Sequence, residues 1–402
     1  MSQVPNEPEV DRPLVAADFA TTLTRTERFK ALAGEWRAYT ILFALAAIWI
    51  FFHFLTNGVF LSARNFSNLM LQTSVTGVLA VGMLMVIVTG QIDLSVGSLV
   101  GLTGGISAVV LTWLGWGLVP SILSALVIGL AIGLFHGLLT AYVNIPAFIV
   151  TLGGLLAWRG AILGISKGQT IPISDPIYRS IGQCFVAPYF GWILAGASVI
   201  AVVWFVIRRS RARASHGLES SNWTSISWQI AAPAVAILVF VYALNSYAGI
   251  PIPVMILLVV ALAGVIVTQN TTFGRYLYAI GGNPDAARLS GINLRKHILV
   301  VFGLMGTLAG VASVIYTARV ASGSPDAGTL LELDAIAACV IGGTSLMGGR
   351  GTVFGAIVGA LIMASLDNGM SLKSVEPYVQ YLVKGAVLVT AVGFDMISRR
   401  RG

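Results

Sequence analysis

The chain of 402 residues is a succession of long apolar segments separated by short polar ones. A helix that crosses the hydrocarbon core of a bilayer needs about 20 apolar residues, and twelve segments approach that length. They are Tyr39–Leu55, Leu69–Thr89, Leu94–Trp113, Leu118–Thr140, Ala147–Ile165, Phe190–Ile207, Gln229–Leu244, Ile252–Thr268, Ile298–Thr317, Leu331–Leu346, Val353–Leu366 and Tyr378–Phe394. Several are short or interrupted by glycine. The pattern therefore predicts an all-α polytopic membrane protein with about ten to twelve transmembrane helices, some of them glycine-broken or re-entrant.

The composition supports this class, because the chain is too apolar to cover a water-facing surface. Hydrophobic residues make up 56% of it and charged residues 10%, whereas soluble domains carry roughly 25% charged residues. The formal net charge is +8, but it does not indicate a nucleic-acid partner, since the basic residues lie at the ends of the apolar segments. Basic residues at these positions indicate which side of the membrane each loop occupies, because cytoplasmic loops carry an excess of lysine and arginine.

The basic residues also predict the orientation of the chain. With the N-terminus in the cytoplasm and twelve crossings, 17 of the 24 lysines and arginines lie inside and five lie outside. We therefore expect both termini in the cytoplasm and a multi-pass location in the plasma membrane. Residues 1–37 are expected to form a polar cytoplasmic tail and residues 38–402 a single transmembrane domain. That domain includes a basic cytoplasmic linker, 208–228, and a cytoplasmic loop, 269–297.

The loop at 269–297 contains the pattern of a short helix with its own caps. Four residues suit the N-cap, the first helical position, the acidic first turn and the C-terminal glycine of such a helix: Asn283, Pro284, Asp285 and Gly291. Basic side chains flank it, among them Arg275 and Arg288. Two interpretations are open, a docking element for a soluble partner or an ordinary connecting loop with a helical turn.

Polar residues and glycines interrupt one apolar region in each half of the chain. The interruptions are Thr89–Ser98 and Glu332–Gly351, and paired broken helices of this kind often line the path of a transported molecule. Asp93 fits either a helix N-cap or a path-lining group. Arg159, within an apolar segment, fits a functional group, a snorkelling side chain or a partner for a carboxylate. Four side chains lie at segment ends, where capping is expected: Glu332, Asp334, Asp367 and Asn368.

The motifs of common enzymes are missing from the sequence. It contains no phosphate-binding loop, no HExxH and no GxSxG. The four histidines do not cluster along the chain, and Cys184 and Cys339 give no support for a disulfide or a metal site; no cofactor is expected. Carboxylates lie mostly at segment edges, whereas a proton-coupled carrier usually needs them inside. The pattern favours a pore-forming subunit whose energy comes from a separate ATPase.

Several stretches between about Leu61 and the C-terminus carry a family resemblance. They are Gly90–Ser98, Pro146–Gly153, Phe273–Arg275, Tyr278–Asn283, Ala286–Ile292, Glu332–Ser345 and Ala364–Met370. Together they resemble the permeases of bacterial sugar ABC importers of the ribose, galactose and xylose group. Within that group the chain is most similar to the D-xylose permeases, on Phe60–Asn65, on Ala364–Met370 and on the extra basic linker with its two flanking helices.

The resemblance implies a subunit that translocates a pentose, D-xylose, across the bacterial inner membrane. It implies a second permease copy, a cytoplasmic ATP-binding subunit and a periplasmic sugar-binding protein. In such systems an inner loop of the permease fits a groove of the ATPase, and Asn283–Gly291 matches that element. The coupling candidates are Arg275, Asn283, Pro284, Asp285, Arg288 and Gly291.

A neutral sugar needs hydroxyl and amide groups along its path rather than a fixed charge. Together with the ionisable Asp93 and Arg159, seven polar residues are candidates: Thr89, Gln91, Ser95, Ser98, Thr344, Ser345 and Asn368. Two other functions remain as alternatives. An ion-coupled secondary sugar carrier would accumulate sugar without an ATPase, and an intramembrane enzyme would need a catalytic cluster, which the sequence does not display.

Overall fold

The computed structural model is almost entirely helical and describes residues 25–215 and 223–400. The chain forms two units, residues 1–40 and residues 41–402, and the packing below is that of the second. The expected tail falls mostly outside the described residues, as does the middle of the expected linker, 216–222. At the two ends of that linker the flanking helices continue to Ser215 and resume at Trp223.

Within the described residues, nine helices are long and apolar enough to cross a membrane. They are α2 (Ala63–Val88), α3 (Val96–Ala108) with its π-helical continuation η1 (Val109–Trp113), α4 (Leu118–Ala141), α5 (Ala147–Ser166), α7 (Pro188–Ser215), α8 (Trp223–Asn245), α9 (Ile252–Val265) continued by η2 (Ile266–Asn270), α12 (Leu294–Val320) and α14 (Val353–Leu372). A shorter apolar stretch, Thr40–Leu55, lies in α1 (Arg25–Leu55). Ten of the twelve predicted segments therefore lie in these helices.

The last two predicted segments differ from each other. Tyr378–Phe394 lies within α15 (Pro377–Arg400), but the predicted span Leu331–Leu346 is only partly helical. Its helix, α13 (Leu331–Ile341), is about 16 Å long at 1.5 Å per residue, roughly half the hydrocarbon thickness. The helix stops because Gly342 and Gly343 follow it, and Gly343 has a φ of +87°, which glycine adopts without a steric penalty.

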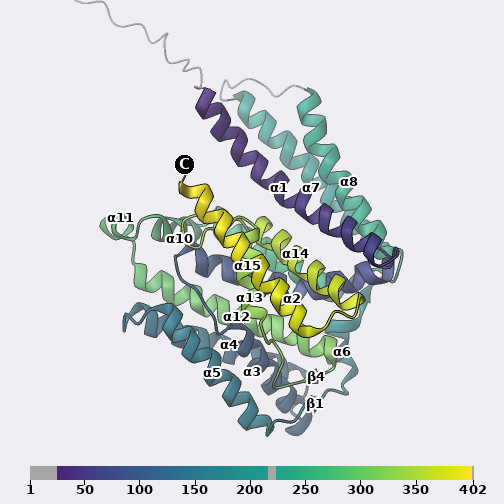
Figure 1. Cartoon of the computed structure of the whole chain (residues 1–402), viewed down its shortest axis with the longest axis vertical. Helices are drawn as coiled ribbons and strands as arrows, with labels where there is room; N and C mark the ends of the chain where they lie inside the picture. Colours follow the sequence, from purple (N-terminus) through teal and green to yellow (C-terminus); the bar gives the residue numbers. More distant parts are fainter. Residues whose placement is uncertain (1–24, 216–222, 401–402) are drawn as a thin grey trace, which may run out of the picture. The chain divides into compact units, whose positions relative to one another are not determined.

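Helix α2 lies at the centre of the unit, and it is buried on all sides because it is apolar all round. Around it pack α9, α12, α13 and α14 (Figure 1). Small residues let neighbouring backbones approach closely. A Cβ atom added at Gly306 would lie 2.0 Å from the carbonyl oxygen of Gly129, so α12 and α4 touch backbone to backbone.

Short elements lie in the connections between several of the long helices. Two antiparallel pairs form, β1 (Ile171–Pro172) with β4 (Ser322–Gly323) and β2 (Phe185–Val186) with β3 (Ile250–Pro251). Helix α6 (Pro176–Gln183) lies between β1 and β2 in the chain and buries Tyr178, whose hydroxyl is 2.9 Å from that of Ser107. Burial raises the pKa of Tyr178 to about 12, so this hydroxyl stays protonated.

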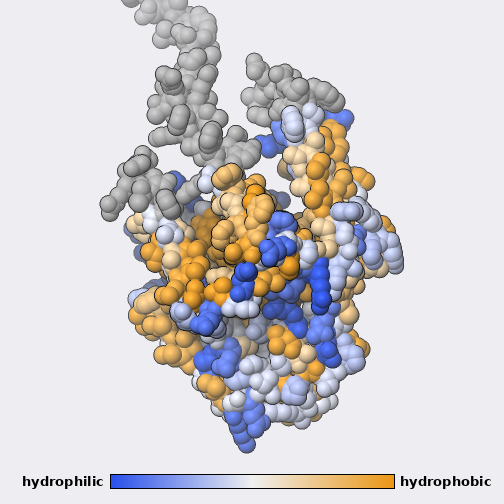
Figure 2. Space-filling model, turned by 45° about the vertical axis from the view of Figure 1, so that its right-hand side comes forward, coloured by the Kyte–Doolittle hydropathy of each residue, from blue (hydrophilic) through white to orange (hydrophobic). Residues whose placement is uncertain are grey.

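The remaining surface of the spans is apolar. Helices α7 and α8 lie side by side (Figure 1) and expose large side chains such as Trp204, Phe205 and Tyr242. Figure 2 shows apolar side chains over much of one face, interrupted by hydrophilic patches. Apolar surface of this extent suits lipid rather than water.

Candidate functional site

The first helix break separates α2 from α3 and is held by a buried hydrogen-bond network. One carboxylate oxygen of Asp93 accepts two bonds from Ser95, from the backbone N–H at 2.8 Å and from the hydroxyl at 2.6 Å. The Ser95 hydroxyl also lies 3.3 Å from Nδ1 of His136 on α4, and Trp158 on α5 donates to the other ring nitrogen at 3.0 Å. Three helices are thereby tied to this break.

The same network fixes the form of His136. An indole N–H only donates, so Nε2 of His136 is the acceptor and the neutral ring carries its hydrogen on Nδ1. That hydrogen points to Ser95, and Ser95 in turn donates to Asp93. Asp93 therefore fixes the turn that precedes α3, whose N-cap is Ser95, and also anchors a network that reaches two other helices. The N-cap interpretation of Asp93 is therefore wrong, because Ser95 holds that position. The path-lining interpretation stays a prediction for this buried residue, of which only 1% is exposed.

The second break runs from Gly342 to Thr352, between α13 and α14, and depends on backbone rather than side chains. Gly343, Gly348, Gly349 and Gly351 all have positive φ, a conformation that favours glycine. The hydroxyls of Thr344 and Ser345 are buried and have no hydrogen-bond partner among the described residues. Unlike the first break, this one leaves polar groups unsatisfied.

The two breaks meet each other at the C-terminal end of α2. The N–H of Gly349 donates to the carbonyl of Val88 at 2.9 Å. A Cβ atom added at Gly348 would lie 3.0 Å from the nitrogen of Gly90, and one added at Gly281 would lie 1.8 Å from the Val88 oxygen. Gly281 belongs to α10 (Thr272–Gly282), the first helix of the predicted cytoplasmic loop. This helix therefore contacts both breaks.

A tyrosine makes a further link between α10 and the second break. The hydroxyl of Tyr278 donates to the carbonyl of Gly351 at 2.9 Å. Burial raises the pKa of Tyr278, partly opposed by a hydrogen bond with Thr268. The hydroxyl is therefore protonated at neutral pH and available as a donor.

The short helix predicted from its caps is present as α11 (Pro284–Leu289). Asn283 is its N-cap and accepts from the N–H of Ala286 at 3.0 Å, Pro284 is the first residue and Asp285 lies in the first turn. Gly291 has a φ of +82°. Arg275 on α10 and Arg288 on α11 are exposed, and Leu289 is 89% exposed. The predicted local structure is confirmed, and it presents an apolar tip beside basic side chains.

The remaining predicted site residues do not join a single cluster. Arg159 donates through Nη1 to the carbonyls of Pro325 and Ala327, so it holds the loop before α13 and does not pair with Asp93. Asn368 on α14 accepts from Asn65 at 2.8 Å near the N-terminal end of α2. The others remain at their own break, where the hydroxyls of Thr89 and Ser98 bond to nearby carbonyls and Gln91 is partly exposed.

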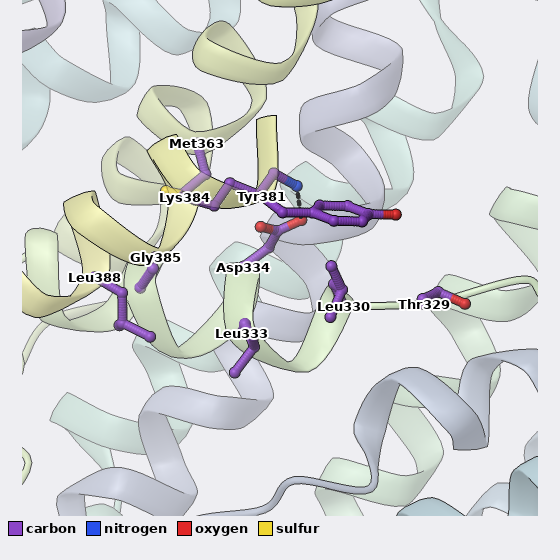
Figure 3. Close-up of a pocket in the computed structure, with 10 residues that line it drawn as sticks. Thr329, Leu330, Leu333, Asp334, Met363, Tyr381, Lys384, Gly385 and Leu388 are labelled. Carbon is purple, nitrogen blue, oxygen red and sulfur yellow. Dashed lines mark hydrogen bonds and ion pairs between the residues drawn. The ribbon is translucent and has the colours of Figure 1, made fainter. Parts of the chain in front are cut away.

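Sequence reasoning missed an ionic group formed by α13, α14 and α15. Lys384 lies 3.0 Å from Asp334 and 2.9 Å from Asp367, and Figure 3 shows its amine beside the Asp334 carboxylate. The expectation that Asp334 serves as a helix cap is therefore wrong, because Leu330 is the N-cap of α13 and the Asp334 carboxylate binds a residue 50 positions away. The available signal was Lys384 itself, an ionisable residue within an apolar segment, which requires a partner.

Comparisons with known proteins agree with this geometry. The BPD_transp_2 family, described as "Branched-chain amino acid transport system / permease component", matches residues 65–212 and 217–392. The xylose transport system permease protein XylH of Escherichia coli K12 is 46% identical over 91% of this chain and 93% of its own length. XylH of Haemophilus influenzae is 47% identical over 93% of this chain and 100% of its own.

The ribose import permease protein RbsC of E. coli K12 is more distant, at 37% identity over 84% of this chain and 87% of its own length. No solved structure matches. Permease components carry out transport rather than catalysis and imply ATP-binding and substrate-binding partners. The spans and these relatives together indicate a multi-pass protein of the bacterial inner membrane, and the chain belongs to the BPD_transp_2 family of transport-system permeases.

Proposed function

We propose that this chain is the permease subunit of an ATP-binding-cassette importer that carries a pentose, D-xylose, across the inner membrane. The observation that supports it most is the identity of 46–47% to xylose permeases along more than nine-tenths of the chain, against 37% to a ribose permease. The structure adds α11, a helix with an exposed apolar tip, which follows directly on α10, the helix that contacts both breaks.

Coupling to the ATP-binding subunit is assigned to the loop that carries α10 and α11. Asn283, Pro284, Asp285 and Gly291 give α11 its ends, while Arg275 and Arg288 offer charges to a partner. Leu289 supplies an apolar contact, and buried apolar anchors dominate many interfaces. A displacement of α11 reaches α10 across the N-cap Asn283, which also ends α10. From there Gly281 and Tyr278 transmit it to both breaks.

The sugar path is assigned to the breaks and the polar groups beside them. The candidate residues are Thr89, Gln91, Asp93, Ser95, Ser98, Arg159, Thr344, Ser345 and Asn368. Thr344 and Ser345 have free hydrogen-bonding capacity, which a passing sugar hydroxyl can use. Asp93 and Arg159 already bond within the chain and act by holding the walls of the path. Movement of the second break opens and closes access.

The transporter is expected to contain two copies of this chain, a cytoplasmic pair of ATP-binding subunits and a periplasmic sugar-binding protein. Co-expression of the chain with the ATP-binding subunit, followed by affinity purification of one, is expected to recover the other. Proteoliposomes that contain both, supplied with the binding protein, are expected to take up D-xylose only with ATP. Uptake by the chain alone, driven by a proton or sodium gradient, would contradict the proposal and favour a secondary carrier.

The coupling role has its own test in Leu289→Asp. The side chain is exposed, so the substitution leaves the permease folded, and thermal unfolding of the purified chain is the control for that. The variant is expected to lose most of the co-purifying ATP-binding subunit, because a charge replaces the apolar contact. Full recovery of that subunit would show that docking occurs elsewhere.

A further inference from the structure

A cavity opens between α13, α14 and α15, away from the two breaks. Its volume is about 340 Å³, and cavities that hold small molecules measure roughly 300–1,000 Å³. Most of the lining is aliphatic, with Leu330, Leu333 and Leu388 among the residues. Figure 3 shows Asp334, Lys384 and Tyr381 together within it. The cavity thus combines apolar walls with a few convergent polar groups.

The polar groups of this cavity are incompletely paired. Lys384 binds one oxygen of Asp334 and one oxygen of Asp367. The second oxygen of each carboxylate is buried and has no hydrogen-bond partner among the described residues. The Asp334 side chain is 5% exposed, so it cannot turn to bulk water. A buried acceptor without a donor is unfavourable. A ligand that carries hydroxyl groups and enters the cavity would supply the missing donor to Asp334, whereas Asp367 lies outside the cavity lining.

The position of Lys384 and Asp367 along their helices indicates whether lipid or water lies beside them. Asp367 lies five residues before the end of α14, and Lys384 lies in the second turn of α15, so both are roughly 10 Å from the outer ends of their helices. Lys384 and Asp367 remain 18% and 29% exposed. Charged side chains at membrane depth border protein or water-filled space, because hydrocarbon does not solvate them. The surface at Lys384 and Asp367 is therefore bordered by protein or water-filled space and not by lipid tails alone.

We propose that the cavity is a subsite for a neutral, polyhydroxylated ligand on the sugar path. This inference rests on the proposed function and assigns it a contact site that the breaks do not provide. The free oxygen of Asp334 accepts from sugar hydroxyls, the Lys384 amine donates to a sugar oxygen, and the half-exposed Tyr381 ring offers a face to the C–H side of the sugar. Two carboxylates against one amine disfavour an anionic sugar phosphate.

The two aspartates give a matched test of this subsite. Each is one of the two partners of Lys384, but the cavity lining includes Asp334 and not Asp367. Asp334→Asn and Asp367→Asn are compared by ATP-driven D-xylose uptake in proteoliposomes of the complete transporter. Loss of one charged hydrogen bond to the sugar raises KM about tenfold or more in Asp334→Asn, whereas Asp367→Asn keeps the wild-type KM. Equal effects of both variants would show an ion pair with a structural role only.

Accessibility provides a second measurement that does not depend on Asp334. In a Cys184→Ser background, since Cys184 is exposed, Leu333→Cys lies in the cavity and Leu382→Cys lies on α15 outside its lining. A membrane-impermeant thiol reagent is expected to label the cavity cysteine at least tenfold faster, and saturating D-xylose but not sucrose is expected to slow that labelling. Equal labelling rates, or labelling unaffected by D-xylose, would overturn the subsite.

The two proposals fail in different ways. If the wild-type complex shows no ATP-driven D-xylose uptake, the proposed function is wrong before any variant is measured. If the wild-type complex transports D-xylose while Asp334→Asn matches Asp367→Asn, only the subsite is wrong.

Discussion

The chain is interrupted between α2 and α3 and again between α13 and α14, and different chemical groups stabilise the two breaks. At residues 89–95 a charged side chain, a hydroxyl and an imidazole fasten the chain to α3, α4 and α5. At residues 342–352 four glycines with positive φ shape the chain, and two buried hydroxyls have no partner among the described residues. The first break is therefore held by side chains from its surroundings, while the second is held mainly by backbone contacts.

The difference indicates which break can move. A network of buried polar bonds resists displacement, because every bond that opens leaves a costly unpaired group. The second break has fewer such bonds to lose, and it contacts α10 through Gly349, Gly351 and their neighbours. We infer that the first break serves as a fixed wall and the second as the segment that follows α10.

The largest expected effect comes from disrupting the contact that joins the two breaks to α10. Gly281→Ala places a methyl group 1.8 Å from the Val88 oxygen and 2.6 Å from the Gly349 nitrogen. These are backbone atoms, so α10 must separate from both breaks, at a cost of about 3 kcal/mol or more. Loss of thermal stability and of ATP-driven uptake is expected in the purified complex. Gly282→Ala is the matched control, since a Cβ atom there meets nothing within 4 Å; equal behaviour of the two would refute this contact.

The second effect tests the fixed break. Asp93→Ala removes the acceptor for both bonds from Ser95, so a buried N–H at the start of α3 loses its partner at a cost of about 1–3 kcal/mol. A lower midpoint of thermal unfolding in detergent is expected. Asp93→Asn keeps an oxygen acceptor and should lose clearly less stability. If alanine and asparagine were equally tolerated, the first break would not depend on this network.

Local parts of this architecture could be predicted from the sequence. The caps of α11 lie within nine residues of one another, so Asn283, Pro284 and Gly291 indicate the helix without knowledge of the fold. The apolar segments likewise predict most of the spans, because their length and composition are sufficient evidence. The bond between Asp93 and Ser95 belongs to the same class, since the two residues are two positions apart.

The parts that the sequence did not predict depend on contacts between distant residues. His136 appeared unconnected to other polar residues, yet it bonds to Ser95, 41 positions before it. Lys384 lies within an apolar segment of the sequence, and its two aspartates lie on other helices. The apolar length of Leu331–Leu346 overstates its helix, because composition measures apolarity, whereas the end of α13 is set by the φ of Gly343. The glycine interruption predicted for this region is confirmed. A single sequence contains no record of which helices become neighbours.

The third effect sharpens the role of the movable break. Tyr278→Phe removes the hydrogen bond to the Gly351 carbonyl while it keeps the ring, and a bond of this kind contributes about 1 kcal/mol. We expect a small loss of stability together with a several-fold loss of D-xylose uptake per ATP hydrolysed, since one link between α10 and the second break is absent. The ratio of uptake to ATP hydrolysis in proteoliposomes measures it. An unchanged ratio would show that the Tyr278 hydrogen bond is not needed for coupling and that the contact at Gly281 is sufficient.

The smallest effect on stability is expected at a threonine of the second break, whose hydroxyl has no hydrogen-bond partner among the described residues, unlike a threonine beside the first break. Thr344→Val replaces a buried hydroxyl that has no partner among the described residues. The free energy of unfolding of the variant should lie within about 0.5 kcal/mol of wild type or be slightly higher, because no bond is lost and an unpaired group is removed. Thr151→Val makes the same exchange beside the first break, where the hydroxyl bonds to the carbonyls of Ala147 at 2.8 Å and Ile92 at 3.3 Å, and it should be the less stable of the two. Thermal unfolding of both variants under one set of detergent conditions gives the comparison. A clear loss of stability in Thr344→Val would mean that its hydroxyl is satisfied by ordered water, and the second break would then be as firmly bonded as the first.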